Sequence, residues 1–157
     1  MLMKMIYSAL LGLFLTTSLY AQQSDLPRAF VLGEKEKVYE QLAQEYSQSL
    51  LEVTGNDITQ AFEHWLDMMQ AIDQYADKIR FDIKGIRVWL HVFWSPEGSI
   101  DHIGYLLRPD SRNVDTAELT AFFSSFARQY VLPLKSSKPF SHYTGATFPT
   151  LNVKATN

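Results

Sequence analysis

The segment from Ile86 to Trp94 constrains the fold of this chain most, because both of its faces are apolar. Alternate residues of a strand point to opposite sides of a sheet. One side here carries aliphatic residues and ends in Trp94, and the other carries Trp89, His91 and Phe93. Such a strand lies inside a sheet and needs cover on both faces. The sequence leaves open whether helices cover both faces or one face stays free for a ligand or partner.

A tight turn is predicted directly after this strand, at residues 95–98 with the sequence SPEG. Pro96 fixes φ at the first turn position and Gly98 supplies a positive φ. We expect a three-residue loop with a glycine bulge. The returning strand then runs from about Ser99 to Leu107.

Two histidines on this predicted hairpin are the obvious candidates for a metal site. In the expected register, residues whose numbers add to 194 face one another. His91 then opposes Ile103 and His102 opposes Val92, so the two imidazoles lie on opposite faces. Only a four-residue loop would bring them together. Because the chain also has no cysteine, we expect no metal site and no cofactor.

Helical periodicity predicts three helices around the hairpin. Apolar residues at helical spacing run from Glu34 to Val53, and a stricter seam runs from Ile58 to Ile79 behind the capping residue Asp57. These two segments predict an N-terminal helical hairpin. A third helix begins after Asp115 and buries a phenylalanine-rich stripe.

The order of elements predicts an α+β fold: an N-terminal helical hairpin followed by a β-β-α-β unit with a small antiparallel sheet. The last strand is expected from Phe140 to Phe148. The domain spans residues 34–151, a flexible lead-in spans 22–33, and a tail spans 152–157. With 46% hydrophobic and 13% aromatic residues, the chain can form an ordinary packed core.

The first 21 residues predict a cleavable secretory signal peptide. Lys4 gives a basic start, Ile6 to Leu15 is apolar, and small uncharged residues precede a cut after Ala21. A permanent membrane helix needs about 18 apolar residues or more, although an uncleaved anchor is the alternative. Without a cysteine there is no site for a lipid anchor. We expect a periplasmic or secreted protein with no membrane span after cleavage.

Charge argues against nucleic acid as a partner. The net charge is −3, and without Lys4 the 14 basic residues become 13 against 17 acidic ones. Nucleic acids and anionic membranes bind basic surfaces.

The second half of the chain contains a series of turn, helix-cap and strand residues in an order that is found in a known family. They are Gly98-Ser99-Ile100 at the hairpin, Ser111 after it, Asp115 at the helix start, Tyr130-Val131-Leu132-Pro133 at the helix end, and Phe148 in the last strand. In this order, the segment from about Arg87 to Leu151 resembles the C-terminal domain of the TonB family.

The resemblance implies a binding mode, in which an exposed edge strand pairs with a partner peptide. TonB energy transducers also carry a retained membrane helix and a long proline-rich spacer. This chain has a predicted signal peptide and helical hairpin in their place, so the resemblance does not imply energy transduction. It assigns no functional residue.

We therefore expect a non-catalytic exported domain that binds a peptide or protein, since no nucleophile elbow or phosphate-binding glycine loop occurs. The alternatives are a small periplasmic enzyme with His102 or His142 as general base, and a ligand pocket lined by Trp89 and Trp65. The candidate binding residues are aromatic or polar residues of the hairpin, the following loop and the last strand: Trp89, Trp94, Tyr105, Arg112, Asn113, His142 and Tyr143.

Overall fold

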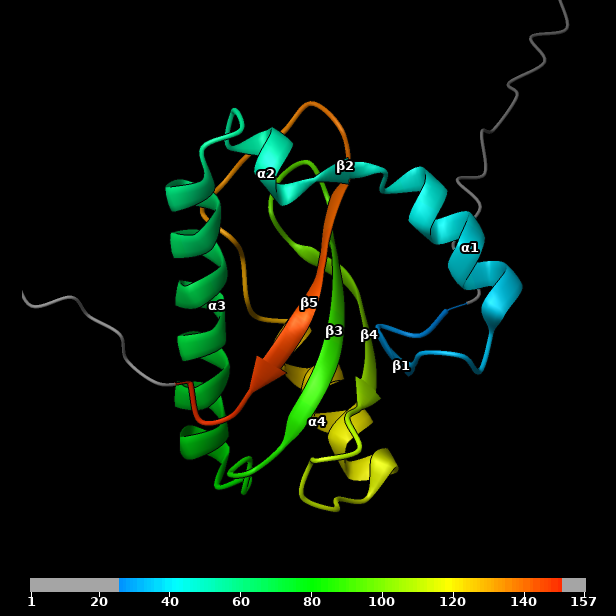
Figure 1. The fold of residues 1–157 in the computed structure, drawn as a ribbon, viewed down its shortest axis with the longest axis vertical. Coiled ribbons are helices and arrows are strands. Elements are labelled where there is room, and N and C mark those ends of the chain that lie inside the picture. Colours follow the sequence, from blue (N-terminus) through cyan, green and yellow to red (C-terminus); the bar gives the residue numbers. More distant parts are fainter. Residues whose placement is uncertain (1–25, 151–157) are drawn as a thin grey trace, which may run out of the picture.

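The computed structural model describes residues 26–150, so the predicted signal peptide and the predicted tail lie outside the described residues. These residues form a five-stranded mixed sheet in the order β1-β4-β3-β5-β2, with helices on both sides (Figure 1). The α+β class is confirmed. The elements are β1 (Ala29–Val31), α1 (Glu36–Glu45), β2 (Gln48–Ser49), α2 (Leu50–Val53), α3 (Ile58–Ile79), β3 (Arg87–Trp94), β4 (Ile100–Leu107), α4 (Thr116–Ala127) and β5 (Phe140–Thr147).

The predicted β-β-α-β order is present as β3, β4, α4 and β5, and β3 pairs antiparallel with both of the other strands. The turn between β3 and β4 is as predicted: Ser95 N–H donates to Ser99 O, and Gly98 has φ +90°. An ideal Cβ at Gly98 would lie 2.2 Å from Leu132 O, so close backbone approach also requires glycine there. The Asp115 side chain caps α4 by accepting from Glu118 N–H.

The predicted hairpin register is correct only next to the turn. Trp94 faces Ile100, but Phe93 faces His102, so Asp101 is an extra residue on β4. From Phe93 back to Val88, the numbers of facing residues add to 195, one more than in the predicted register. The bulge allows Ile100 and Ile103, which are three residues apart, both to be buried on one face. The predicted placement of His91 and His102 on opposite faces is therefore wrong.

The single helix predicted from Glu34 to Val53 is divided into α1, β2 and α2, and no helical hairpin forms. Leu42 of α1 packs on one face of the sheet, whereas Leu50 of α2 packs in the core on the other. One continuous helix cannot serve both faces, so the chain crosses the sheet edge at β2. A capping box between Ser49 and Glu52 then begins a new helix.

The segment predicted as a flexible lead-in (residues 22–33) contains a packed strand, β1, in its described part. Ala29 and Phe30 are buried, and β1 pairs in parallel with β4. Ala29 belongs to the main core, and Phe30 belongs to a second cluster on the other side of the sheet. Burial on both sides fixes this short strand at the sheet edge.

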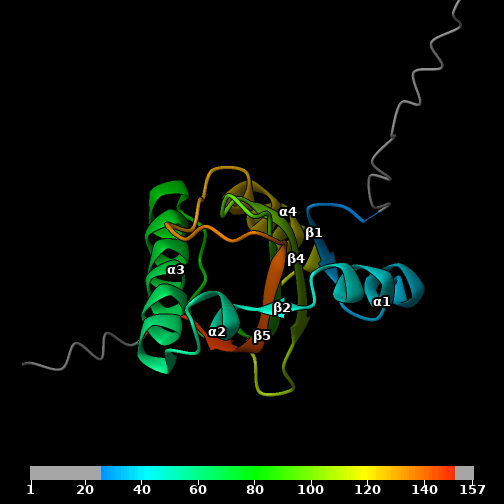
Figure 2. The same cartoon turned by 90° about the horizontal axis from the view of Figure 1, so that it is seen from above.

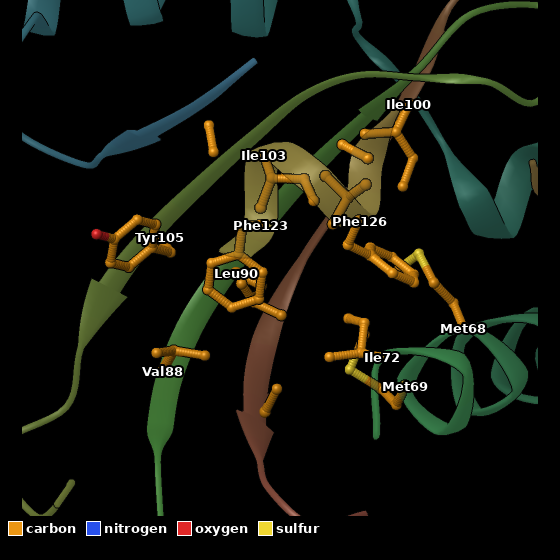
Figure 3. Packing of buried hydrophobic residues seen from close by; sticks show 14 of the residues in the cluster. Met68, Met69, Ile72, Val88, Leu90, Ile100, Ile103, Tyr105, Phe123 and Phe126 are labelled. Atoms are coloured by element: carbon orange, nitrogen blue, oxygen red, sulfur yellow. The ribbon is translucent and has the colours of Figure 1, made fainter. Parts of the chain in front are cut away.

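The face of the sheet that carries Val88 and Leu90, here called the inner face, packs against α3 and α4 (Figures 2 and 3). Tyr105 and Phe123 lie in this core (Figure 3). The middle of the α3 seam is buried as expected, but its ends are exposed at Ile58, Phe62 and Ile79. Within residues 26–150, no helix is both long and apolar enough to cross a membrane.

The opposite face, here called the outer face, carries Trp89, His91 and Phe93. The helix α1 lies on this side, across the sheet from α3 (Figure 2). Leu42 and Tyr46 pack around Phe93 in a small cluster that also includes Leu26 and Phe30. This cluster covers the end of the outer face near the β3–β4 turn.

Candidate functional site

The other half of the outer face is uncovered and displays three large apolar side chains. Trp89 is 39% exposed, Leu106 44% and Tyr143 51%. Trp89 faces Leu106 on β4 and Gly145 on β5, so the three side chains come from three adjacent strands. We call Trp89, Leu106 and Tyr143 the aromatic platform. Clustered exposed side chains of this kind typify interaction surfaces.

The Trp89 ring lies beside Gly145 of β5. An ideal Cβ at Gly145 would be 3.2 Å from Trp89 Cζ3, so glycine leaves the space that the indole occupies. The ring is nearly parallel to that of Tyr143, with centroids 6.0 Å apart. The guanidinium carbon of Arg108 lies 5.5 Å from the Trp89 ring centre, within cation–π range. These contacts extend the indole toward the outer edge of the sheet.

Two arginines border the platform. Arg87 and Arg108 both form ion pairs with Asp110, at 2.7 and 3.2 Å. The hydrogen bond from Arg87 lowers the pKa of Asp110 below its ordinary value. Two guanidinium groups share one carboxylate, so this border keeps a net positive charge.

The outer edge of β5 is open beside the platform. In the described chain, β2 pairs only with Phe140 and Ser141 of β5. The N–H of Phe148 donates to Ile86 O, and even-numbered residues of β5 face even-numbered residues of β3. Hydrogen-bonding direction alternates along an antiparallel strand. The backbone amides of Tyr143, Gly145 and Thr147 therefore point away from β3, toward the open edge.

His91 lies between this platform and α1, and it is 8% exposed. Its Nδ1 is 2.9 Å from the Tyr39 hydroxyl and its Nε2 is 3.1 Å from Ser141 Oγ. Ser141 Oγ also donates to the carbonyl of Tyr46, at 2.9 Å. Burial, with a smaller effect of His142, lowers the pKa of His91 to about 4.

The bulge at Asp101 brings His91 and His102 to the same face, where they lie opposite different residues. His91 faces Gly104, whereas His102 faces Phe93. His102 Nδ1 lies 3.0 Å from the carbonyl of Pro27, and both nitrogens of His91 contact hydroxyl groups. Within residues 26–150, no group of three or more potential ligands is arranged to hold a metal ion.

Among the predicted binding residues, Trp89 and Tyr143 meet on the platform, whereas Trp94 and Tyr105 are fully buried on the inner face. Trp94 stacks on Phe140. The Tyr105 hydroxyl donates to the carbonyl of Thr116 at the start of α4. Both are core residues.

The predicted polar cluster of Arg112, Asn113, His142 and Tyr143 is not assembled. Arg112 donates to the carbonyls of Asp82 and Lys84 and thereby holds the turn before β3. Asn113 follows it in an exposed loop. His142 and Tyr143 are consecutive strand residues and point to opposite faces.

The ligand pocket predicted between Trp89 and Trp65 is not formed. Trp65 contacts His142 on the inner face, with ring centres 4.8 Å apart and ring planes tilted by 59°. The sheet therefore separates Trp65 from Trp89, and the two line no common pocket. Burial lowers the pKa of His142.

Sequence reasoning missed Leu106, Arg108 and Gly145, as well as the Tyr39–His91–Ser141 contacts. A usable signal was present for the first group. Burying Ile100, Ile103 and Tyr105 together requires a bulge in β4, and that bulge places Leu106 beside Trp89. The contacts of Tyr39 had no local signal, because they join residues 52 positions apart.

No protein-family model, curated protein or solved structure matches this chain.

Proposed function

We propose that this domain binds an extended peptide segment of a partner protein, which adds a strand to the open edge of β5 and contacts the aromatic platform. The outward amides of Tyr143, Gly145 and Thr147 beside the exposed Trp89 ring are the observation that carries this proposal. Unpaired strand edges bind extended peptides through main-chain hydrogen bonds, and neighbouring pockets select side chains.

The open edge has defined ends. At one end, the chain leaves β2 and turns into α2 at Leu50, which is buried. At the other end, Thr150 N–H donates to Asp73 of α3 at 2.7 Å. Residues 143–147 lie between these ends, and at about 3.4 Å per residue they span roughly 17 Å. The site therefore suits a short segment of about five residues.

Side-chain selection comes from the platform. Alternate side chains of an added strand would point to the outer face, beside Tyr143 and the Trp89 ring over Gly145. Aromatic or aliphatic side chains suit these rings. The positive border of Arg87 and Arg108 favours an acidic residue near the Thr147 end, since Arg87 faces Thr147.

The proposal includes export to the periplasm or the outside of the cell, which rests on the leader sequence of residues 1–21. It also includes the TonB-like binding mode suggested by residues 87–151. The partner class is a peptide or protein, with no nucleic acid, lipid anchor or cofactor involved.

A random heptapeptide library displayed on phage, panned against the purified protein, provides the probe. Selected peptides are synthesised and titrated against variants by isothermal calorimetry. We expect Trp89→Ala to weaken binding roughly 30-fold, as loss of an aromatic anchor does. Val131→Ala is the control, because Val131 is an exposed apolar residue outside the platform, opposite Ser99 beside the β3–β4 turn, and it should leave affinity unchanged.

A second pair of variants tests the backbone edge. Thr147→Pro removes an outward N–H and should weaken binding roughly tenfold, in line with one lost hydrogen bond. Thr147→Ala keeps that N–H and should bind normally. A library without binders, or binders insensitive to both Trp89→Ala and Thr147→Pro, would refute the proposal.

A further inference from the structure

We infer that α1 is a pH-controlled cover of the outer face, held in place by neutral His91 and released when His91 takes up a proton. Release would expose Phe93 and His91 and so lengthen the aromatic platform. The release of α1 stands independently of peptide binding, whereas its effect on binding rests on the proposed function.

The hydrogen bonds around His91 specify one protonation state. The carbonyl of Tyr46 can only accept, so the proton of Ser141 Oγ is directed to it. Ser141 Oγ then accepts from His91, which places a hydrogen on Nε2. In the neutral ring Nδ1 is bare, and it accepts from the Tyr39 hydroxyl. Each donor in this series of hydrogen bonds, from the Tyr39 hydroxyl to the Tyr46 carbonyl, thus has one acceptor.

A second proton on His91 disturbs this arrangement. It would enter at Nδ1, where the Tyr39 hydroxyl already donates, so the hydroxyl would have to turn and give up its acceptor. The positive ring would also be buried against Phe93, whose ring centre is 4.0 Å away. Burying an ionised group costs free energy unless it is paired.

The surroundings offer the charged ring no counter-ion. The titratable groups packed against it are Tyr39 from α1 and Tyr143 from β5. His142 lies behind them on the inner face and disfavours a further positive charge. β4 presents Gly104 opposite the ring. Hydration is therefore the main way to stabilise the proton, and the side chain that stands in its way is Tyr39.

α1 is the covering element best able to move. Its contacts with the sheet come from the small cluster of Leu42 and Tyr46 with Phe93 and Phe30, whereas α3 and α4 share the much larger inner core. The hydroxyl of Tyr46 adds one hydrogen bond to Asp101. Undocking of α1 would leave the inner core intact.

Hydrogen exchange of the α1 amides, corrected for the intrinsic effect of pH, measures undocking without any peptide. A released histidine has its ordinary pKa of 6.5 and a docked one a pKa of about 4. The undocking constant should therefore rise roughly 20-fold between pH 7 and pH 5, while the α3 amides stay protected. His91→Gln keeps an Nε donor but does not titrate, so it should abolish this rise. His142→Gln, at the half-buried histidine of the inner face, should retain it.

Three results would overturn the inference: protection of α1 that does not change with pH, an unchanged pH response in His91→Gln, or equal loss of protection in α1 and α3. If His91→Gln does not fold, NMR titration of the His91 ring in the natural protein decides the matter. An ordinary pKa of about 6.5 would contradict the inference. Failure of the peptide proposal would leave these exchange measurements unaffected.

Discussion

The inner face of the sheet packs against two helices over its whole length, whereas the outer face packs against one short helix over half of its length. Inner residues such as Val88 and Leu90 are fully buried, but on the outer face Trp89 remains 39% exposed. The same strand, β3, supplies both rows. The difference shows that apolar residues on one strand can serve two purposes, a permanent core and an accessible surface.

The largest expected effect is on the free energy of unfolding, and it should differ between substitutions on the two faces. Phe123→Ala empties a fully buried site on the inner face and should cost about 3–5 kcal/mol in the free energy of unfolding. Phe93→Ala should lower the free energy of unfolding by less. The substitution weakens the docking of α1 on the sheet, so its effect cannot exceed the free energy of that docking. Urea denaturation of both variants measures this. Equal losses would mean that the two clusters unfold as one unit.

Acid should weaken the outer face first. The folded-state pKa of His91 lies below its unfolded value, so its contribution to stability is complete above pH 6.5 and declines as the pH falls toward about 4. The decline amounts to at most about 3 kcal/mol. Denaturation at pH 7 and pH 4.5 should show a smaller difference for His91→Gln than for the natural protein. A difference of the same size would assign the acid sensitivity to other groups.

Substitutions at two glycines, Gly104 and Gly145, allow a covered position on the outer face to be compared with an uncovered one. An ideal Cβ at Gly104 would lie 2.6 Å from Leu32 Cδ2 and 3.0 Å from Phe30 Cζ, beneath the packed lead-in segment. Gly104→Val should therefore destabilise the fold by about 1–3 kcal/mol. At Gly145 the neighbour is the exposed Trp89 ring, which can shift, so Gly145→Ala should stay within about 0.5 kcal/mol. Thermal denaturation of both variants tests the contrast, and a larger loss for Gly145→Ala would contradict it.

On the platform, the effects of one substitution on stability and on binding should separate. Trp89→Ala removes a side chain that is already 39% exposed, so it should cost about 1–2 kcal/mol, less than the loss at Phe123, while strongly reducing peptide binding. Equilibrium unfolding and calorimetry on the same sample separate the two effects. A loss of several kcal/mol would make Trp89 a core residue.

The sequence was sufficient where the determinants are local. Gly98 and Pro96 specify the hairpin turn, Asp115 caps α4, and the apolar spacing of α3 gives its buried middle. Each of these patterns depends on neighbouring residues along the chain, and the structure confirms them.

The predictions were wrong or incomplete where the structure depends on residues far apart in the sequence. The break of the first helix at Tyr46 occurs because Leu42 and Leu50 serve opposite faces, which periodicity along one segment cannot reveal. The three residues of β1 are too few to show alternation, and their burial depends on β4. The uncovered half of the outer face follows from the length of α1, so sequence alone could name Trp89 and Tyr143 but could not separate them from the core residues Trp94 and Tyr105.

The open edge of β5 is the central claim, and amide hydrogen exchange measured residue by residue by NMR tests it most directly. In the free protein, the amides of Tyr143, Gly145 and Thr147 should exchange rapidly, while those of the alternate residues His142, Thr144 and Ala146 are protected by β3. A bound peptide should slow the first three selectively. Uniform protection of β5 in the free protein, or a bound peptide that leaves these three amides unchanged, would contradict the account.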